Sequence, residues 1–221
     1  MIGGIVFFFI CIGVPVGAAI YFYQRRDGSI KTFLVGMLGF FVAQPLLRMS
    51  IISILQRQDP DLAVLPYTNT VLYYLILALT AGIFEECARW LCFKFLRKGR
   101  VSWTEGVAYG FGHGGLEAFW IFTAQVLPVI LMGQANIGML VGSWERVASI
   151  ALQIGFSLIV IYSVGQKKPL YLLLAILLHT LVDFQVILGN AWIVEGILTV
   201  EAIVAVLLIK KSKEKGWIQK A

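Results

Sequence analysis

Long apolar segments alternate with short polar connections along the whole chain. Seven of these segments reach the roughly 20 residues that an α-helix needs to cross the hydrocarbon layer of a bilayer. They cover residues 2–23, 30–55, 66–93, 106–132, 143–164, 170–188 and 191–209. The pattern predicts an all-α, polytopic transmembrane helix bundle of about seven spans, with residues 1–221 forming a single integral membrane domain.

The composition favours a membrane protein over a soluble one. Of the 221 residues, 59% are hydrophobic and 14% are charged, whereas soluble domains carry about 25% charged residues. The formal net charge of +6 could suggest a nucleic-acid ligand, but the basic residues lie in short clusters between the apolar segments. We therefore expect a multi-pass protein of the cell membrane whose partners include lipids and no nucleic acid.

The basic residues fall in every second connection between the expected spans. They follow spans one, three, five and seven and are Arg25, Arg26, Lys31, Lys94, Arg97, Lys98, Arg100, Lys167, Lys168, Lys210, Lys211, Lys213, Lys215 and Lys220. The alternate connections contain only Arg57 among basic residues. Because cytoplasmic loops carry the excess of Lys and Arg, the pattern predicts the N-terminus outside and the C-terminus in the cytoplasm.

Three of the spans contain ionisable residues, which are costly inside a bilayer and therefore mark candidate functional sites. On each of these helices, two such residues lie four positions apart and so share a face. The pairs are Glu85 and Arg89, His113 and Glu117, and His179 and Asp183, with Glu86 beside the first pair. Because lipid offers no hydrogen-bond partners, we expect the three polar faces to turn inward and meet.

The three polar faces are expected at one depth in the membrane. Glu86, His113 and His179 each lie eight to ten residues from the polar segment at the cytoplasmic end of their span. At 1.5 Å per residue, this places them roughly 12–15 Å from that end. Residues 66–188 are thus expected to form the core that carries the motifs, and a substrate is expected to enter laterally or from the cytoplasm.

Two histidines and several carboxylates at one depth suit the hydrolysis of a bond within the membrane. In one mechanism they bind a catalytic metal such as zinc, which keeps one position for water and lowers the pKa of that water to about 7. In the other, a buried glutamate takes a proton from water without a metal, while a histidine orients the water or stabilises the oxyanion. The residue types leave the choice between these mechanisms open.

The motifs on these spans resemble those of the type II CAAX prenyl endopeptidase superfamily, which includes the PrsW-like proteases. They read Glu85-Glu86-x-x-Arg89, Tyr109-x-x-x-His113 and His179-x-x-x-Asp183. Two details distinguish the chain from the CAAX endopeptidases: the arginine follows the second glutamate by three positions rather than four, and glycines surround the first histidine. In these details, and in the Glu145-Arg146 pair, the chain most resembles the YhfC-like branch of intramembrane metalloproteases.

The resemblance implies an intramembrane protease that hydrolyses a peptide bond in a membrane-embedded protein or peptide. The implied catalytic residues are Glu85, Glu86, His113, His179 and Asp183, the supporting residues are Arg89 and Glu117, and the metal ligands are Glu86, His113 and His179. In this scheme either glutamate could activate water, Asp183 would assist His179, and Arg89 would hold a glutamate in place. The difference in arginine spacing leaves open which glutamate does so and whether the substrate is prenylated.

Two other functions stay open at the level of the sequence. The acids and histidines could form a proton relay in a transporter, or they could belong to a non-catalytic scaffold or immunity protein that binds a membrane partner. Glu85, Glu86 and Arg89 could also form a structural ion pair, although such a pair needs only one carboxylate. The sequence contains no internal repeat of the kind found in many transporters, which favours the protease.

Overall fold

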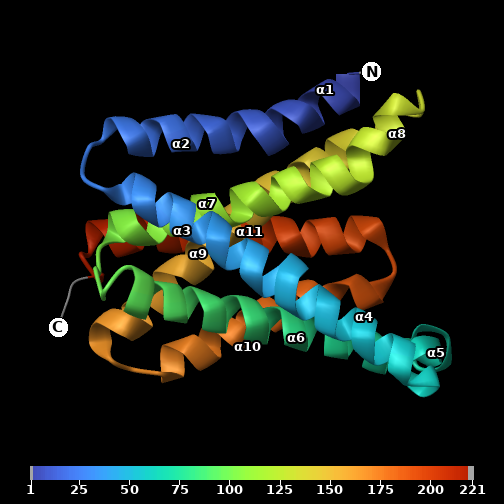
Figure 1. Ribbon diagram of the computed structural model, residues 1–221. Coiled ribbons are helices and arrows are strands. Elements are labelled where there is room, and N and C mark those ends of the chain that lie inside the picture. The colour runs from blue at the N-terminus through green and yellow to red at the C-terminus, as the bar shows by residue number, and fades with distance from the viewer. Residues whose placement is uncertain (1, 219–221) are drawn as a thin grey trace.

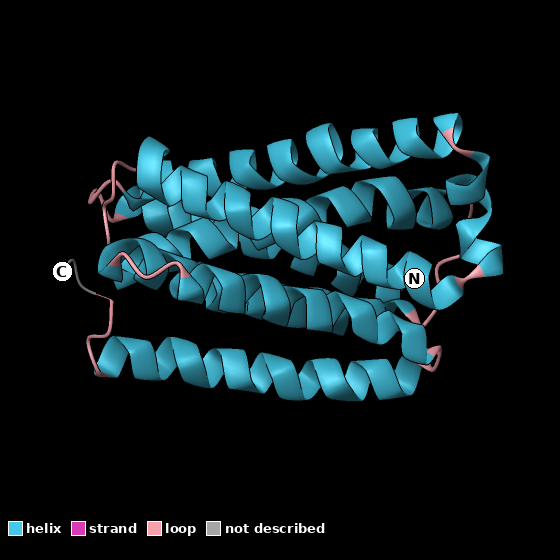
Figure 2. Cartoon of the chain, turned by 90° about the horizontal axis from the view of Figure 1, so that it is seen from below, coloured by secondary structure: helices cyan, strands magenta, loops and turns pink. Residues whose placement is uncertain are grey.

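The computed structural model describes residues 2–218, which are helical almost throughout and contain no β-strand. Their long helices lie side by side in a bundle (Figure 1, Figure 2). Within this range, seven helical segments are long and apolar enough to cross a membrane. The predicted all-α, polytopic fold class and the predicted number of spans are therefore confirmed.

Each of the first four spans contains a stretch of π-helix, labelled η1 to η4. Span one consists of α1 (Ile2–Phe8), η1 (Phe9–Gly13) and α2 (Val14–Gln24). Span two consists of α3 (Ser29–Phe41), η2 (Val42–Arg48) and α4 (Met49–Gln58). A short helix, α5 (Pro60–Thr68), leads to span three, which consists of α6 (Thr70–Leu91) and η3 (Cys92–Leu96).

The remaining four spans complete the bundle. Span four consists of α7 (Trp103–Ile121), η4 (Phe122–Val126) and α8 (Leu127–Leu131). Span five is α9 (Met139–Gln166), and span six consists of α10 (Leu170–Phe184) and the 3₁₀ turn η5 (Gln185–Leu188). Span seven is α11 (Ala191–Glu214).

The predicted start of the third span, at residue 66, was wrong. The structure ends α5 at Thr68 and begins α6 at Thr70. Asn69 explains the break, because its side-chain oxygen accepts a hydrogen bond from the amide of Leu72 and so caps the new helix. Pro66 consequently lies in the short helix α5 rather than in the membrane span.

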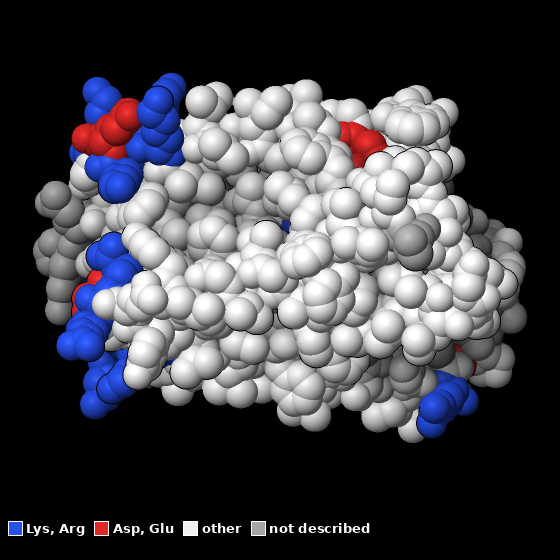
Figure 3. Space-filling view, turned by 90° about the horizontal axis from the view of Figure 1, so that it is seen from above, with Lys and Arg blue, Asp and Glu red and all other residues white. Residues whose placement is uncertain are grey.

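The connections rich in Lys and Arg lie at one end of the bundle. Figure 1 places the α2–α3, α6–α7 and α9–α10 connections at the same end as the C-terminus. Figure 3 shows most of the visible basic side chains at one end, a smaller basic group at the other end, and a middle with almost no charge. We call the end with the connections rich in Lys and Arg the basic end, and we call the end with α5 and the α8–α9 and α10–α11 connections the opposite end. Which side of the membrane each end faces stays a prediction.

Helix α7 packs tightly between α3 and α9 because its glycines let the backbones approach. A Cβ atom at Gly112 would overlap the carbonyl oxygen of Phe33 in α3, and one at Gly110 would overlap the backbone of Ile154 in α9. Small residues favour such close helix packing in membranes. The close packing that these glycines allow places His113 of α7 in the interior of the bundle.

Candidate active site

Two adjacent glutamates of α6 contact two different helices. Successive residues of an α-helix point about 100° apart, so Glu85 faces α7 while Glu86 faces α10. The Glu85 carboxylate lies 2.8 Å from Nε2 of His113, and the Glu86 carboxylate lies 2.7 Å from Nδ1 of His179. All four side chains are buried. The structure thus brings together the four residues that the sequence placed on three separate spans.

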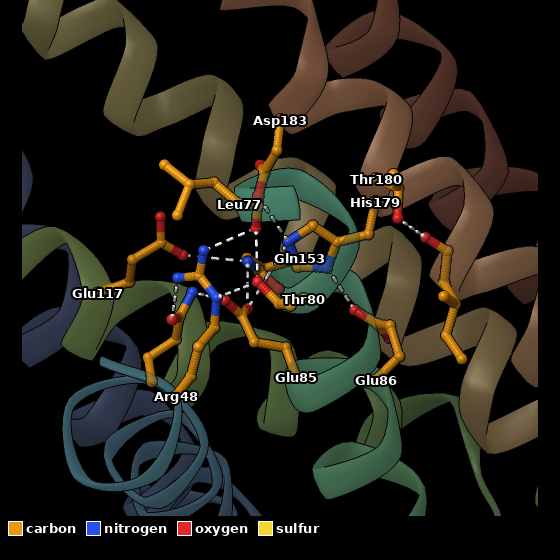
Figure 4. A network of polar contacts seen from close by, with 12 residues as sticks. Arg48, Leu77, Thr80, Glu85, Glu86, Glu117, Gln153, His179, Thr180 and Asp183 are labelled. Atoms are coloured by element: carbon orange, nitrogen blue, oxygen red, sulfur yellow. Dashed lines mark hydrogen bonds and ion pairs between the residues drawn. The ribbon is translucent and has the colours of Figure 1, made fainter. Parts of the chain in front are cut away.

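His179 has a carboxylate near each of its ring nitrogens (Figure 4). Since an ionised carboxylate can only accept a hydrogen bond, the contact with Glu86 places the proton on Nδ1. The other nitrogen, Nε2, lies 3.8 Å from Oε2 of Glu85 and 3.8 Å from Oδ2 of Asp183. His113 contacts the same Oε2 of Glu85, so the Nε2 atoms of both histidines converge on one carboxylate oxygen.

Arg89 lies against Glu86 rather than Glu85. Its Nη1 is 3.3 Å from Oε2 of Glu86, and both side chains are completely buried. The guanidinium also donates to the backbone oxygen of Gln153 at 3.3 Å and to the side-chain oxygen of that residue. Glu86 is therefore held between a cation and His179, which fixes the orientation of the imidazole ring.

Gln153 of α9 connects the site and was missed by the sequence analysis. Its amide nitrogen donates to Glu117 at 3.0 Å and to Glu85 at 3.4 Å, while its carbonyl oxygen accepts from Arg89. The search for ionisable residues passed over a neutral amide. The available signal was a polar stripe in span five, because Ser149 and Ser157 lie four residues to either side of Gln153.

A second amide reaches the site from the π-helical segment of span two. Gln44 donates to the Glu85 carboxylate, and Arg48 donates to the Gln44 carbonyl oxygen at 2.7 Å. Arg48 also donates to the backbone oxygen of Leu77 at 2.6 Å. Pro45 lies within this segment and has no amide proton to donate to a regular helix, which accounts for the local irregularity.

Glu117 has a cationic partner that comes from the start of α9. Arg146 is buried, and its Nη1 lies 3.2 Å from Oε1 of Glu117. The same guanidinium also pairs with the half-exposed Glu145. The Glu145-Arg146 pair is thus part of the polar layer, with Arg146 shared between two carboxylates.

The donor atoms in this layer fit a metal ion that prefers nitrogen and oxygen ligands. One ligand atom each from Glu85, His113 and Glu117 lie within 4.8 Å of one another. His179 carries a carboxylate on its other nitrogen, as metal-binding histidines usually do, whereas Nδ1 of His113 has no partner among residues 2–218. Of the metal ligands that the family resemblance implied, this group contains His113, with Glu85 and Glu117 in place of Glu86 and His179.

A small polar cavity adjoins these side chains. Its volume is about 90 Å³, and it is lined by Gln44, Glu85, Glu117, Ser149, Leu152, Gln153, Phe156, His179, Val182 and Asp183. A water molecule takes about 30 Å³ in the liquid, so the cavity can hold more than one. Water in this cavity would lie beside both the carboxylates and His179.

The fold and this site define a multi-pass membrane protein with a buried histidine–carboxylate centre. The family model of the YhfC intramembrane metalloproteases matches residues 10–139 and 123–207, and the chain belongs to that family. The chain is also 33% identical to the uncharacterized membrane protein YhfC of Bacillus subtilis (strain 168) over 94% of its own length and 91% of the relative. No solved structure matches the chain significantly. The predicted family resemblance is confirmed.

Proposed function

We propose that the protein is an endopeptidase of the cell membrane that hydrolyses a peptide bond of a membrane-embedded substrate. The observation that carries the proposal is the convergence of His113 Nε2 and His179 Nε2 on one oxygen of Glu85, beside a cavity that can hold water. A carboxylate that can accept a proton and a source of water are the minimum requirements for hydrolysis by general-base catalysis.

In the proposed mechanism, Glu85 is the proton acceptor. It takes a proton from a water molecule in the cavity while the water oxygen bonds to the carbonyl carbon of the scissile peptide. The C–N bond then breaks, and Glu85 returns the proton to the leaving nitrogen. His179 faces the same space, and with a proton on both ring nitrogens it would donate from Nε2 to the carbonyl oxygen and stabilise the negative charge that develops there.

The surrounding residues position this machinery. Glu86 and Arg89 fix His179, because the carboxylate lies between the guanidinium and the imidazole. Gln44 and Gln153 donate to Glu85 from two sides and hold its carboxylate toward the cavity. Phe156 stacks on His179 at 4.9 Å between ring centroids and covers the ring with an apolar surface.

In the alternative, metal-dependent mechanism, Glu85, His113 and Glu117 would hold the ion with His179 beside them, and Glu85 would be a ligand rather than the proton acceptor. Zinc suits these nitrogen and oxygen donors, and when bound it would polarise the scissile carbonyl and make the attacking water more acidic. Metal analysis of the purified protein separates this mechanism from the metal-free one. About one equivalent that is lost in His113→Ala and retained in the surface variant Glu214→Gln supports the metal; no metal in any variant leaves Glu85 as the sole activator.

New protein N-termini test the proposed function directly. Membranes with wild-type protein are compared with membranes that carry Glu85→Gln at equal expression. We expect N-termini that occur only with the wild type, and their sequences would define the cleavage site. Thermal unfolding in detergent serves as the control that the variant is folded. Identical sets of N-termini, with both proteins folded, would contradict the proposal and favour the transporter or scaffold.

A further inference from the structure

A larger cavity lies directly beside the small polar cavity that adjoins Glu85. Its volume is about 310 Å³, which falls within the usual range for ligand sites. The two cavities share Glu117, Ser149, Val182 and Asp183 in their walls. We call the larger one the vestibule. A molecule in the vestibule is thus separated from Glu85 by no more than the side chains that line both spaces.

The vestibule extends from the active site toward the opposite end of the bundle. Its walls include Tyr74 from the start of α6 and Arg146 from the start of α9. They also include Val186 from η5 and Glu195 from the first turns of α11. All these segments lie next to the connections that contain few basic residues, so the vestibule leads away from the basic end.

The walls of the vestibule suit a polypeptide. Leu77, Val182 and Leu198 provide an apolar surface for side chains. Among residues 2–218, the buried oxygens Oε1 of Gln185 and Oε2 of Glu195 have no hydrogen-bond donor. The amide nitrogen of Gln185 is already engaged with Glu201, which leaves its oxygen as the free group. A peptide backbone supplies the N–H donors that two such acceptors lack.

We infer that the substrate polypeptide reaches Glu85 through this vestibule, from the end opposite the basic loops. The inference rests on the proposed protease function and replaces the expectation of entry from the cytoplasm or from the side. If the basic end is cytoplasmic, as its charge predicts, the substrate is a polypeptide segment at the external face of the membrane.

Thiol labelling tests the route without requiring catalysis. In a background with Cys11, Cys87 and Cys92 replaced by alanine, a single cysteine is placed at Ala78, which lines the vestibule, or at Ala81. Both alanines lie on α6 and are 2% exposed, so Ala81 is a matched control outside the two cavities. A cationic, membrane-impermeant thiosulfonate is applied to vesicles of each orientation. Single cysteines at Gly189, in the α10–α11 connection, and at Lys168, in the α9–α10 connection, mark the opposite end and the basic end.

We expect Ala78→Cys to react from the side that labels Gly189→Cys, at least tenfold faster than Ala81→Cys, and not from the side that labels Lys168→Cys. Reaction from the Lys168 side, or no reaction above the Ala81 control, would overturn the route. A variant with Ala78→Trp should lower cleavage by the folded protein at least tenfold by narrowing the vestibule. Labelling without any wild-type cleavage would instead refute the protease function and leave the vestibule in place.

Discussion

Two buried carboxylate clusters lie in this bundle, and their partners differ in kind. Near the basic end, Glu105 accepts a hydrogen bond from Thr32 and pairs with Arg97 at 3.2 Å and Arg100 at 3.3 Å. This single carboxylate is thus matched by two arginines. Such a cluster stabilises the helix ends that it joins and offers no free group for chemistry.

In the part of the chain that the structure describes, the Glu85 carboxylate has no arginine partners of the kind that Glu105 has. Among residues 2–218, no arginine lies within ion-pair distance of Glu85, whose partners are Gln44, Gln153 and two histidines. Burying a carboxylate with no permanently charged arginine beside it costs free energy. The contrast with Glu105 supports the proposal that Glu85 exchanges a proton or binds a cation.

The largest expected difference between the clusters is in catalysis. Glu85→Gln keeps the shape of the side chain but removes the proton acceptor, so we expect cleavage to fall by about 10²–10⁴-fold. Glu105→Gln, assayed as folded protein at a temperature where it is stable, should cleave at the wild-type rate. Rates are measured on a peptide that spans the mapped cleavage site. Equal losses in both variants would show that the two clusters do not differ in function.

The free energy of unfolding should fall more in Glu105→Gln than in Glu85→Gln, the reverse of the order expected for cleavage. Glu105→Gln leaves the buried Arg97 without its carboxylate, and breaking a buried pair costs about 3–5 kcal/mol in the free energy of unfolding. Glu85→Gln removes an unmatched charge and should leave the free energy of unfolding unchanged or raise it. Unfolding by SDS in dodecylmaltoside micelles measures both. A loss for Glu85→Gln as large as that for Glu105→Gln would mean that the site is a structural ion cluster.

The sequence could predict those features of the site that follow from helical periodicity and from the free-energy cost of exposing charged side chains to lipid. The spacing of four between His113 and Glu117, and between His179 and Asp183, predicted that their helices face inward, because lipid penalises any other orientation. The sequence could not predict that Glu86 contacts His179 while Glu85 contacts His113. That depends on the rotation of α6 against two neighbours, which side-chain packing sets. The sequence did not assign Gln153 and Gln44 to the site, because a neutral amide carries no such penalty.

A smaller effect is expected at Gln153, which donates to both Glu85 and Glu117. Gln153→Leu keeps a similar volume but releases both carboxylates. Loss of such an outer contact typically lowers metal affinity or activity by about 10–100-fold. We expect the loss in kcat with little change in KM, and a shift in the pH–rate profile, because Gln153 positions the carboxylates without binding substrate.

Ser157→Ala provides the control for Gln153→Leu. Ser157 lies one turn further along α9, is buried and donates only to the backbone oxygen of Gln153. Its removal should leave kcat and the pH–rate profile unchanged. If both variants lower kcat equally without moving the profile, Gln153 supports the packing of α9 rather than the positions of the carboxylates.

The smallest effect is expected at Asp27, an exposed carboxylate in the connection before α3. This residue tests how much a carboxylate paired with an arginine adds to the free energy of unfolding outside the bilayer. Hydrogen bonds from the hydroxyl and amide of Ser29 and the contact with Arg25 lower the pKa of Asp27 below its usual range. A carboxyl group whose pKa is lowered on folding stabilises the fold above the unfolded-state pKa of about 3.9, and this stabilisation is lost as the pH falls further. Asp27→Asn should therefore cost about 1 kcal/mol or less at pH 7, since exposed pairs are screened by solvent. The difference from the wild type should shrink below about pH 4. A difference that stays constant down to pH 3 would assign the effect to the shape of the turn rather than to the charge.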